Sequence, residues 1–124
     1  MKSLRRLPDG ELEVMQIIWH GETPMPRSVI EKELTESKYL AATTILTFLT
    51  RLCDKGFLTM EKQGRINYYT PIVTEKDYLA SESRNILDRL YGGSLSAFAA
   101  SLCDGGISRE EIEALREMLE KGTL

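Results

Sequence analysis

The sequence predicts a mainly α-helical chain that carries one small β-hairpin. Apolar residues recur at helical spacing over most of its 124 residues, which is typical of helices that bury one face. The period changes over residues 57–70, where β-branched and aromatic residues lie on both sides of a glycine, as they do in a hairpin. Glycine pairs at 92–93 and 105–106 then divide the remaining helical pattern into short pieces.

Two helices are expected before residue 40. The first covers residues 7–20 and ends at Gly21, and the second begins with Pro26 and continues to about residue 36, because proline is favoured in the first turn of a helix. Residues 22–26 cannot be helical before Pro26 and should form an extended connector with a short edge strand. The residues expected to face inward from these two helices are Leu12, Met15, Ile18, Trp19, Val29, Ile30 and Leu34.

The third predicted helix, residues 40–56, has two sharply different faces. Its buried stripe follows helical spacing and consists of Ile45, Phe48, Leu49 and Leu52. Its outer face collects Thr43, Thr44, Thr47, Thr50 and Arg51. Threonines are poor helix formers for a merely solvated surface, but their hydroxyls and methyls suit phosphates and base edges in a DNA groove, as arginine suits phosphate or guanine. The alternative is a β-branched surface that tertiary packing tolerates.

A hairpin follows the third helix. Its expected strands are residues 57–62 and 66–70, with Gly64 at the tip. Three helices followed by a hairpin is the order of a winged helix-turn-helix, so residues 1–72 are predicted to form a DNA-binding domain of this class. The basic residues expected to contact backbone phosphate from the wing are Lys62 and Arg65.

Residues 73–124 are predicted to form three short helices. Thr74 with Asp77, and Ser108 with Glu111, have the spacing of capping boxes that begin the first and last of these helices. Short helices with few large residues do not support a core of their own, so this region is expected to be a dimerisation region completed by a second copy. The residues expected in the dimer interface are Leu79, Ile86, Leu87, Leu90, Leu95, Phe98, Leu102, Ile112, Leu115 and Leu119.

The net charge of −3 is unevenly distributed. Residues 1–72 hold 10 basic and 9 acidic residues, which is +1, whereas residues 73–124 hold 6 and 10, which is −4. Residues 38–72 alone hold 5 and 2, which is +3, and this pattern fits a binding face joined to a separate assembly module. No apolar run approaches the roughly 20 residues of a membrane span, so no membrane insertion is expected.

Other chemistry-bearing residues are interpreted as structural. Cys53 and Cys103 lack metal or redox spacing and should be free, partly buried thiols in a reducing, cytoplasmic compartment. His20, the only histidine, should be a surface or helix-capping residue. No nucleophile motif, phosphate loop or metal-ligand spacing occurs, so the sequence predicts no enzyme, no cofactor and no metal site. Of Tyr68 and Tyr69, one should pack inward and the other should face solvent or phosphate.

These blocks together resemble the penicillinase-repressor family of bacterial winged-helix regulators. The resemblance covers nearly the whole chain and rests on four segments in order: LPDGELEVMQIIW, TTILTFLTRLCDKGFLTMEKQGRINYYTP, YLASESRNILDRLYGGSLSAF and ISREEIEALREML. The second segment is the most specific, because a T-[IV]-x-T-x-L-x-R-L helix, a K-G pair and a G-R-x-x-x-Y wing occur together in it.

The resemblance implies a homodimeric repressor that binds a palindromic operator in double-stranded DNA. The regulated genes would be β-lactam-resistance or related genes. The residues that the resemblance assigns to operator contact are Thr44, Thr47, Arg51 and Arg65. Family members often carry Lys or Gln where this chain has Thr43, Leu46 and Thr50, so the implied DNA-binding face is less basic than is usual.

Induction in this family is proteolytic, and the resemblance extends that expectation to this chain. A sensor-linked protease would cleave in the fifth helix, where the candidate bond here is Ser101-Leu102 in place of the common Asn-Phe. Copper-responsive members carry paired Cys-x-Cys motifs, which Cys103 alone cannot provide, so metal sensing is not expected. The low net charge leaves open an alternative, a winged-helix adaptor that binds protein without specific DNA, and salt dependence of duplex binding would separate the two.

Overall fold

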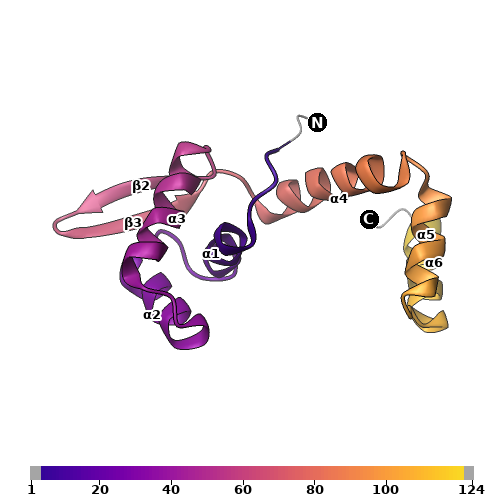
Figure 1. Cartoon of the computed structure of the whole chain (residues 1–124), viewed down its shortest axis with the longest axis horizontal. Coiled ribbons are helices and arrows are strands. Elements are labelled where there is room, and N and C mark those ends of the chain that lie inside the picture. The colour runs from indigo at the N-terminus through magenta and orange to yellow at the C-terminus, as the bar shows by residue number, and fades with distance from the viewer. Residues whose placement is uncertain (1–3, 122–124) are drawn as a thin grey trace. The chain divides into compact units, whose positions relative to one another are not determined.

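The computed structural model describes residues 4–121 and has the predicted order of three helices, a hairpin and three further helices (Figure 1). The helices are α1 (Asp9–Trp19), α2 (Arg27–Lys38), α3 (Ala42–Asp54), α4 (Glu75–Tyr91), α5 (Leu95–Asp104) and α6 (Arg109–Lys121). The strands are β1 (Met25–Pro26), β2 (Leu58–Gln63) and β3 (Ile66–Pro71). The predicted fold class, mainly α with a small hairpin, is confirmed. None of the described helices is long and apolar enough to cross a membrane.

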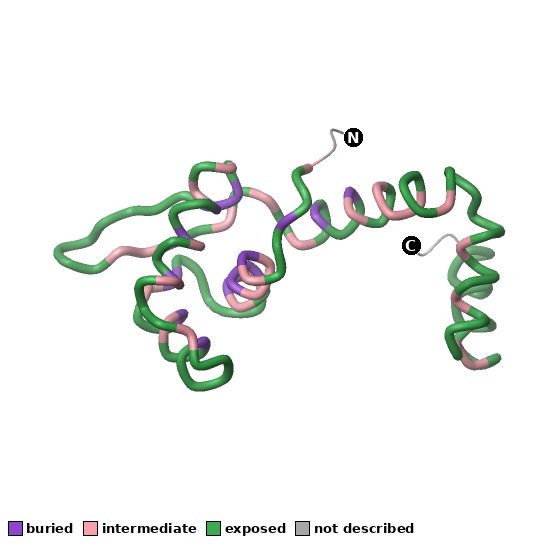
Figure 2. The backbone as a smooth tube through the Cα atoms, viewed as in Figure 1, coloured by how far each residue is buried: buried purple, intermediate pink, exposed green. Residues whose placement is uncertain are grey.

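The chain divides into two compact units, one up to Glu82 and the other from Ser83 onwards. The first unit has one continuous apolar core made by α1, α2, α3 and the sheet, and Figure 2 shows the buried segments of these elements in purple. The core residues contributed by the three helices are Val14, Met15, Ile18, Ile30, Leu34, Ile45, Leu49 and Leu52. The buried stripe predicted for α3 is therefore confirmed, with Phe48 half-buried at its edge.

The three strands form an antiparallel sheet in the order β1-β3-β2. In the central strand β3, Tyr69 lies opposite Met25 of β1 and Met60 of β2. Tyr69 is buried and Tyr68 is only half-buried, since successive side chains of a strand point to opposite faces. Tyr69 is thus the tyrosine that packs inward, and the predicted short edge strand is the two-residue β1.

Two features of α2 differ from the prediction. Val29 is 43% exposed and not buried, because Ile30 and Leu34, one turn apart, supply the core contacts of this helix and leave Val29 at the margin of a narrow apolar stripe. The helix begins at Arg27, because Pro26 pairs with β3, and it continues to Lys38, beyond the predicted end near residue 36.

A buried ion pair connects α1 to the end of α3. Glu11 is 1% exposed, and its carboxylate accepts a hydrogen bond from Nζ of Lys55, the residue that follows α3. The two residues are far apart in the sequence, since Glu11 lies in the first turn of α1 and Lys55 directly follows α3. The pairing satisfies a charge that would be costly to bury alone.

The beginning of α4 belongs to the first unit. Tyr78 and Ser81 of α4 are buried, and the rings of Trp19 and Phe57 pack on Tyr78 with centroid distances of 5.7 and 5.8 Å. The polar contacts that hold this region are the Leu4 N–H to Ser81 Oγ (2.8 Å), the Leu7 N–H to Tyr78 Oη (2.9 Å), Trp19 Nε1–H to the Val73 carbonyl (2.9 Å) and His20 Nε2 to Glu75 Oε2 (2.7 Å). The compact units consequently divide inside α4, whereas the sequence predicted a division after residue 72.

The second unit consists of the remainder of α4 with α5 and α6. Neither α5 nor α6 contains a fully buried residue among those described, and the ring of Phe98 packs on Tyr91 at 5.3 Å between centroids. The predicted capping box at the start of α6 is confirmed, because the Glu111 N–H donates to Ser108 Oγ and the Ser108 N–H donates to Glu111 Oε1, both at 3.1 Å. These helices keep regular ends while their apolar side chains stay largely uncovered.

Candidate nucleic-acid interface

The outer face of α3 presents the predicted polar residues on a rigid support. Thr43, Thr47, Thr50 and Arg51 are exposed, and Thr44 is half-buried at the edge of the same face. On the other side of the helix the stripe from Ile45 to Leu52 is buried in the core. The structure thus brings together the five residues of α3 that the sequence predicted for DNA contact.

The hydroxyls of two of these threonines are already engaged. Thr47 Oγ1 donates to the carbonyl of Thr43 at 3.0 Å, and Thr50 Oγ1 donates to the carbonyl of Leu46 at 2.9 Å. Such bonds to the preceding turn are the local alternative that threonine uses within helices. Each of these hydroxyls can therefore still accept a hydrogen bond from a partner, and each side chain also presents a methyl group.

The basic residues of the candidate interface carry positive charges without partners. The side chains of Arg51, Lys62 and Arg65 are exposed and make no hydrogen bond or ion pair within the described part of the chain. Among the other described cations of the first unit, Arg5, Lys32 and Lys76 likewise have no ion pair, whereas four pair with glutamates: Arg6, Arg27, Lys38 and Lys55. Unpaired cationic groups are suited to phosphate, because no internal contact has to be broken before they bind.

The β2–β3 hairpin places its basic residues at its far end. Gln63 pairs with Ile66 across a two-residue turn of Gly64 and Arg65, and Figure 1 shows the hairpin extending beyond α3. Gly64 has a φ of 64° whereas Arg65 is not in the left-handed region, which is the pattern of a hairpin turn with glycine first. The wing residues therefore lie apart from the α3 face, on the same unit.

Two exposed residues near this face were not predicted as site residues. Leu46, 38% exposed, follows Thr43 by three positions and precedes Thr50 by four, so that it borders both on the helix surface. Tyr39 is 90% exposed and has a φ of 56° in the turn between α2 and α3. The helical spacing of Leu46 with the threonines is a signal that the sequence already contained.

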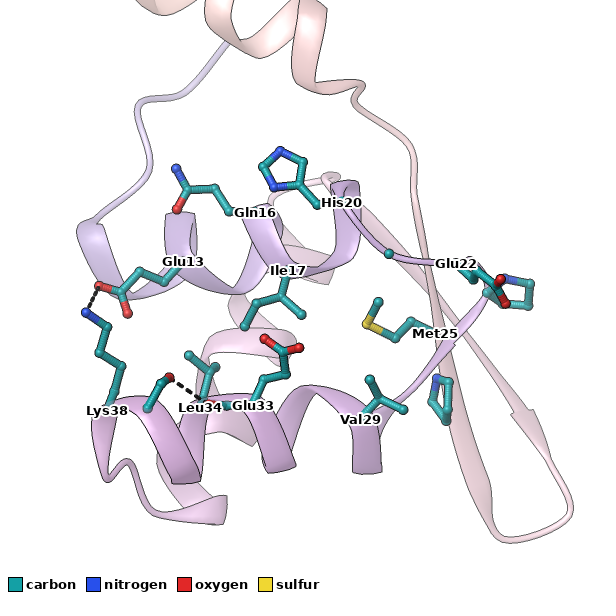
Figure 3. Close-up of a pocket in the computed structure, with 14 residues that line it drawn as sticks. Glu13, Gln16, Ile17, His20, Glu22, Met25, Val29, Glu33, Leu34 and Lys38 are labelled. Atoms are coloured by element: carbon teal, nitrogen blue, oxygen red, sulfur yellow. Dashed lines mark hydrogen bonds and ion pairs between the residues drawn. The ribbon is translucent and has the colours of Figure 1, made fainter.

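A groove of about 620 Å³ lies between α1, β1 and α2 (Figure 3). Ile17 and Met25 point into it, while Glu13 reaches toward Lys38 across 4.0 Å and Glu33 adds a second carboxylate. None of the described residues that were predicted to contact DNA lines it. With Glu22, three carboxylates and one ammonium group line the groove, so its side chains carry a net negative charge, which is unfavourable for phosphate.

In the second unit, apolar side chains remain uncovered. Leu90 and Leu95 are 63% and 66% exposed, and Ile112, Leu115 and Leu119 are exposed along α6. The predicted interface residues that are half-buried are Ile86, Leu87, Phe98 and Leu102. Leu79, also predicted for the dimer interface, is an exposed residue of the first unit.

The candidate cleavage bond lies inside α5. Ser101 is exposed and Leu102 is half-buried, and the Ser101 carbonyl accepts the hydrogen bond of the Gly105 N–H at 2.9 Å. Both cysteines are free. Cys53 is half-buried as predicted, whereas the prediction of a partly buried Cys103 is wrong, because Cys103 is exposed on α5, a helix with no buried residue. Burial raises the pKa of the Cys53 thiol, and the carboxylate of Asp54 raises it further. No group of three or more metal-ligating side chains occurs among the described residues.

Three helices with an exposed third helix, followed by an antiparallel hairpin, define a winged helix-turn-helix protein. The sequence profile described as "Penicillinase repressor" matches residues 7–121. The chain belongs to the penicillinase repressor family. A penicillinase repressor of Bacillus licheniformis is 38% identical over 122 residues, covering 98% of this chain and 94% of the relative. The methicillin resistance regulatory protein MecI of Staphylococcus aureus strain N315 is 33% identical over 116 residues, covering 93% and 94%.

Solved structures show the same fold for the first part of the chain. The solution structure of the DNA binding domain of the repressor BlaI is 40% identical, with a TM-score of 0.55, over 63% of this chain and 94% of that one. The solution structure of monomeric Bacillus licheniformis BlaI with the blaP half-operator matches with a TM-score of 0.53 at the same identity and coverage. The predicted family resemblance and the winged-helix fold are both confirmed.

Proposed function

We propose that this protein is a cytoplasmic transcriptional repressor that binds palindromic operator DNA as a homodimer. The observation that carries the proposal is the exposed α3 face, where threonines and the unpaired Arg51 stand on a helix fixed by the core. A relative with the same fold is solved with a half-operator. Because the relatives are named as penicillinase and methicillin-resistance regulators, we propose β-lactam-resistance or related genes as its targets, and no catalytic activity.

In this mechanism α3 enters the major groove of the operator, and the β2–β3 wing contacts the phosphate backbone of the DNA. An α-helix fits the major groove of B-DNA, where base edges are distinguishable. Arg51 would reach a phosphate or a guanine from the helix, and Lys62 and Arg65 would contact phosphates beside the groove. Release of counterions from these phosphates favours binding and makes the affinity fall as salt rises.

The second unit would join two such domains. Its uncovered leucines on α4, α5 and α6 make a surface that a second copy can cover, and a twofold pair places the same residues on both sides. Two α3 helices would then reach major grooves about 34–36 Å apart on one face of the duplex. The operator is therefore expected to be an inverted repeat.

Relief of repression would follow from cleavage in α5 by a sensor-linked protease. Ser101-Leu102 is held in a regular helical turn, so the protease must unwind this turn before it cuts. Cleavage would separate α6, with Ile112, Leu115 and Leu119, from the rest of the chain. The chain would lose dimer contacts while its DNA-binding unit stayed folded, and operator affinity would fall because the two half-sites would bind independently.

Fluorescence anisotropy with a labelled duplex of the promoter upstream of this gene tests the proposal. Binding to the duplex is expected to weaken by a factor of about 10³ or more between roughly 50 and 200 mM salt if six or more phosphates are contacted. A scrambled duplex of equal length and composition is the control. Equal affinity for both duplexes, or no binding in dilute buffer, would contradict a specific repressor and favour the adaptor alternative.

A further inference from the structure

The outer face of α3 carries one large apolar side chain, Leu46, beside its threonines and Arg51. Leu46, 38% exposed, lies beside Thr43 and Thr50 at the three- and four-residue spacings that make helix neighbours. Arg51 is about 140° around the helix axis from Leu46, at about 100° per residue. The face thus has an apolar margin at Leu46 and a cationic margin at Arg51, with threonines between them.

Hydrogen bonding makes the threonines of this face less polar than their composition indicates. The hydroxyl protons of Thr47 and Thr50 are donated to the carbonyls of Thr43 and Leu46 at 3.0 and 2.9 Å. These side chains can accept a hydrogen bond, but they cannot donate one without breaking a bond inside the helix. Their methyl groups, by contrast, take part in no hydrogen bond, and Thr50, four residues after Leu46, is its neighbour on the helix surface.

In the major groove, thymine is the base that presents a methyl group, and apolar side chains contact it. We infer that Leu46 and Thr50 read the 5-methyl groups of thymines in each operator half-site, with Thr47 completing the apolar surface. The inference rests on the proposed operator binding and adds to it the base class that α3 selects. Arg51, at the other margin, then serves a guanine or a phosphate outside this patch.

Replacement of single thymines by deoxyuridine tests the inference, because the exchange removes only the methyl group. The full-length protein is titrated at fixed salt against duplexes of about 30 base pairs that contain the promoter's inverted repeat, each with one thymine replaced in both half-sites. At one or two positions the affinity should fall about fourfold per half-site, the amount expected for one buried methyl group. Replacement of thymines outside the repeat is the control and should leave the affinity unchanged.

Matched variants then assign the effect to side chains. The Leu46→Ala and Thr50→Ser proteins should bind the thymine duplex more weakly than the wild type does. Each should also lose the difference in affinity between thymine and deoxyuridine at the base that the replaced side chain contacts. Thr50→Val removes the hydroxyl, which donates to the Leu46 carbonyl, but keeps a methyl group, so this variant should retain the preference for thymine over deoxyuridine that Thr50→Ser loses. Circular dichroism spectra check that each variant is folded, and the deoxyuridine series on the wild-type protein needs no variant.

Three results would overturn the inference. Wild-type protein that binds the promoter but is indifferent to every deoxyuridine exchange would show that thymine methyls are not read. A Thr50→Val loss as large as that of Thr50→Ser would assign the contact to the hydroxyl. Failure of the wild-type protein to bind the promoter duplex at all would remove the proposed function, and the inference with it, and is distinguishable from the other two results.

Discussion

One contact of the first unit joins two charged side chains that are largely removed from water. Glu11 and Lys55 pair across the core boundary, with side chains 2% and 16% exposed. A pair so thoroughly removed from water contributes little net stability, but it makes the loss of either partner costly. The packing of α3 against α1 therefore includes an ion pair that lies outside the face proposed to bind DNA.

Replacement of Lys55 by methionine should lower the free energy of unfolding of the first unit by about 3–5 kcal/mol, because it leaves the Glu11 carboxylate buried without a countercharge. Urea unfolding followed by fluorescence of Trp19, the only tryptophan, measures this change. Lys38→Met is the matched control, since it breaks an exposed pair with Glu13 and should change stability by at most about 1 kcal/mol. Equal effects of the two variants would contradict the assigned role of Glu11.

The two thiols should differ in reactivity. Thiolate is the reactive form of cysteine, and burial, reinforced by Asp54, holds the pKa of Cys53 above its usual value. Cys103 is exposed. Native protein treated with iodoacetamide at neutral pH should be alkylated at Cys103 well before Cys53, as mass spectrometry of the digested protein would show, whereas protein in urea should react at both. Faster reaction of Cys53 in the folded protein would show that it is not protected.

Among the elements, α3 joins the fold to the proposed function. Its two faces were predictable because a helical period of about 3.6 residues separates buried from exposed positions whatever the partner. The capping box of α6 and the hairpin turn at Gly64 were predictable for a similar reason, since short-range hydrogen bonds and backbone torsions determine them.

Features that depend on distant residues were not predictable in this way. In the sequence, Glu11 resembles a solvated acidic residue, because its partner Lys55 comes beside it only in the folded chain. Tyr78 belongs to the first unit because its hydroxyl accepts a hydrogen bond from the N–H of Leu7, which is distant in the sequence. Val29 is exposed because α2 contacts the core through only a narrow stripe of side chains, which the sequence pattern does not reveal. The hydroxyl bonds of the α3 threonines depend on side-chain torsions that the sequence leaves free.

The Arg51→Ala variant tests the role of α3 in DNA binding. Loss of the guanidinium, which has no partner among the described residues, should weaken operator affinity by about 1–3 kcal/mol without changing stability by a comparable amount. Anisotropy titration at fixed salt measures it. Lys76→Ala, which removes an exposed cation from the start of α4, is the control for net charge. If both variants bind the operator as tightly as the wild type, Arg51 is not at the interface.

The whole molecule joins a well-packed unit to one that exposes much of its apolar surface. All core residues of the described chain belong to the first unit, while the second unit carries uncovered leucines. Scattered exposed leucines are ordinary, but an amphipathic stripe along α6 indicates an interface. A dimer would cover this stripe.

A double substitution, Leu115→Glu with Leu119→Glu, should convert the dimer to a monomer, because two carboxylates would have to be buried without partners. Sedimentation velocity should report the monomer, and operator affinity should fall about 100-fold or more as the two half-sites become independent. Glu113→Gln, an exposed position on the same helix, is the control. A variant that stayed dimeric would place the interface elsewhere.

The stoichiometry of the complex with the promoter duplex tests the central claim most directly. Native mass spectrometry of the full-length protein with the intact inverted repeat should show two chains per duplex, and a duplex with only one half-site should bind far more weakly at the same salt. A single chain on the intact repeat, or equal affinity for the half-site and the whole operator, would contradict a twofold pair that presents two α3 helices to the DNA.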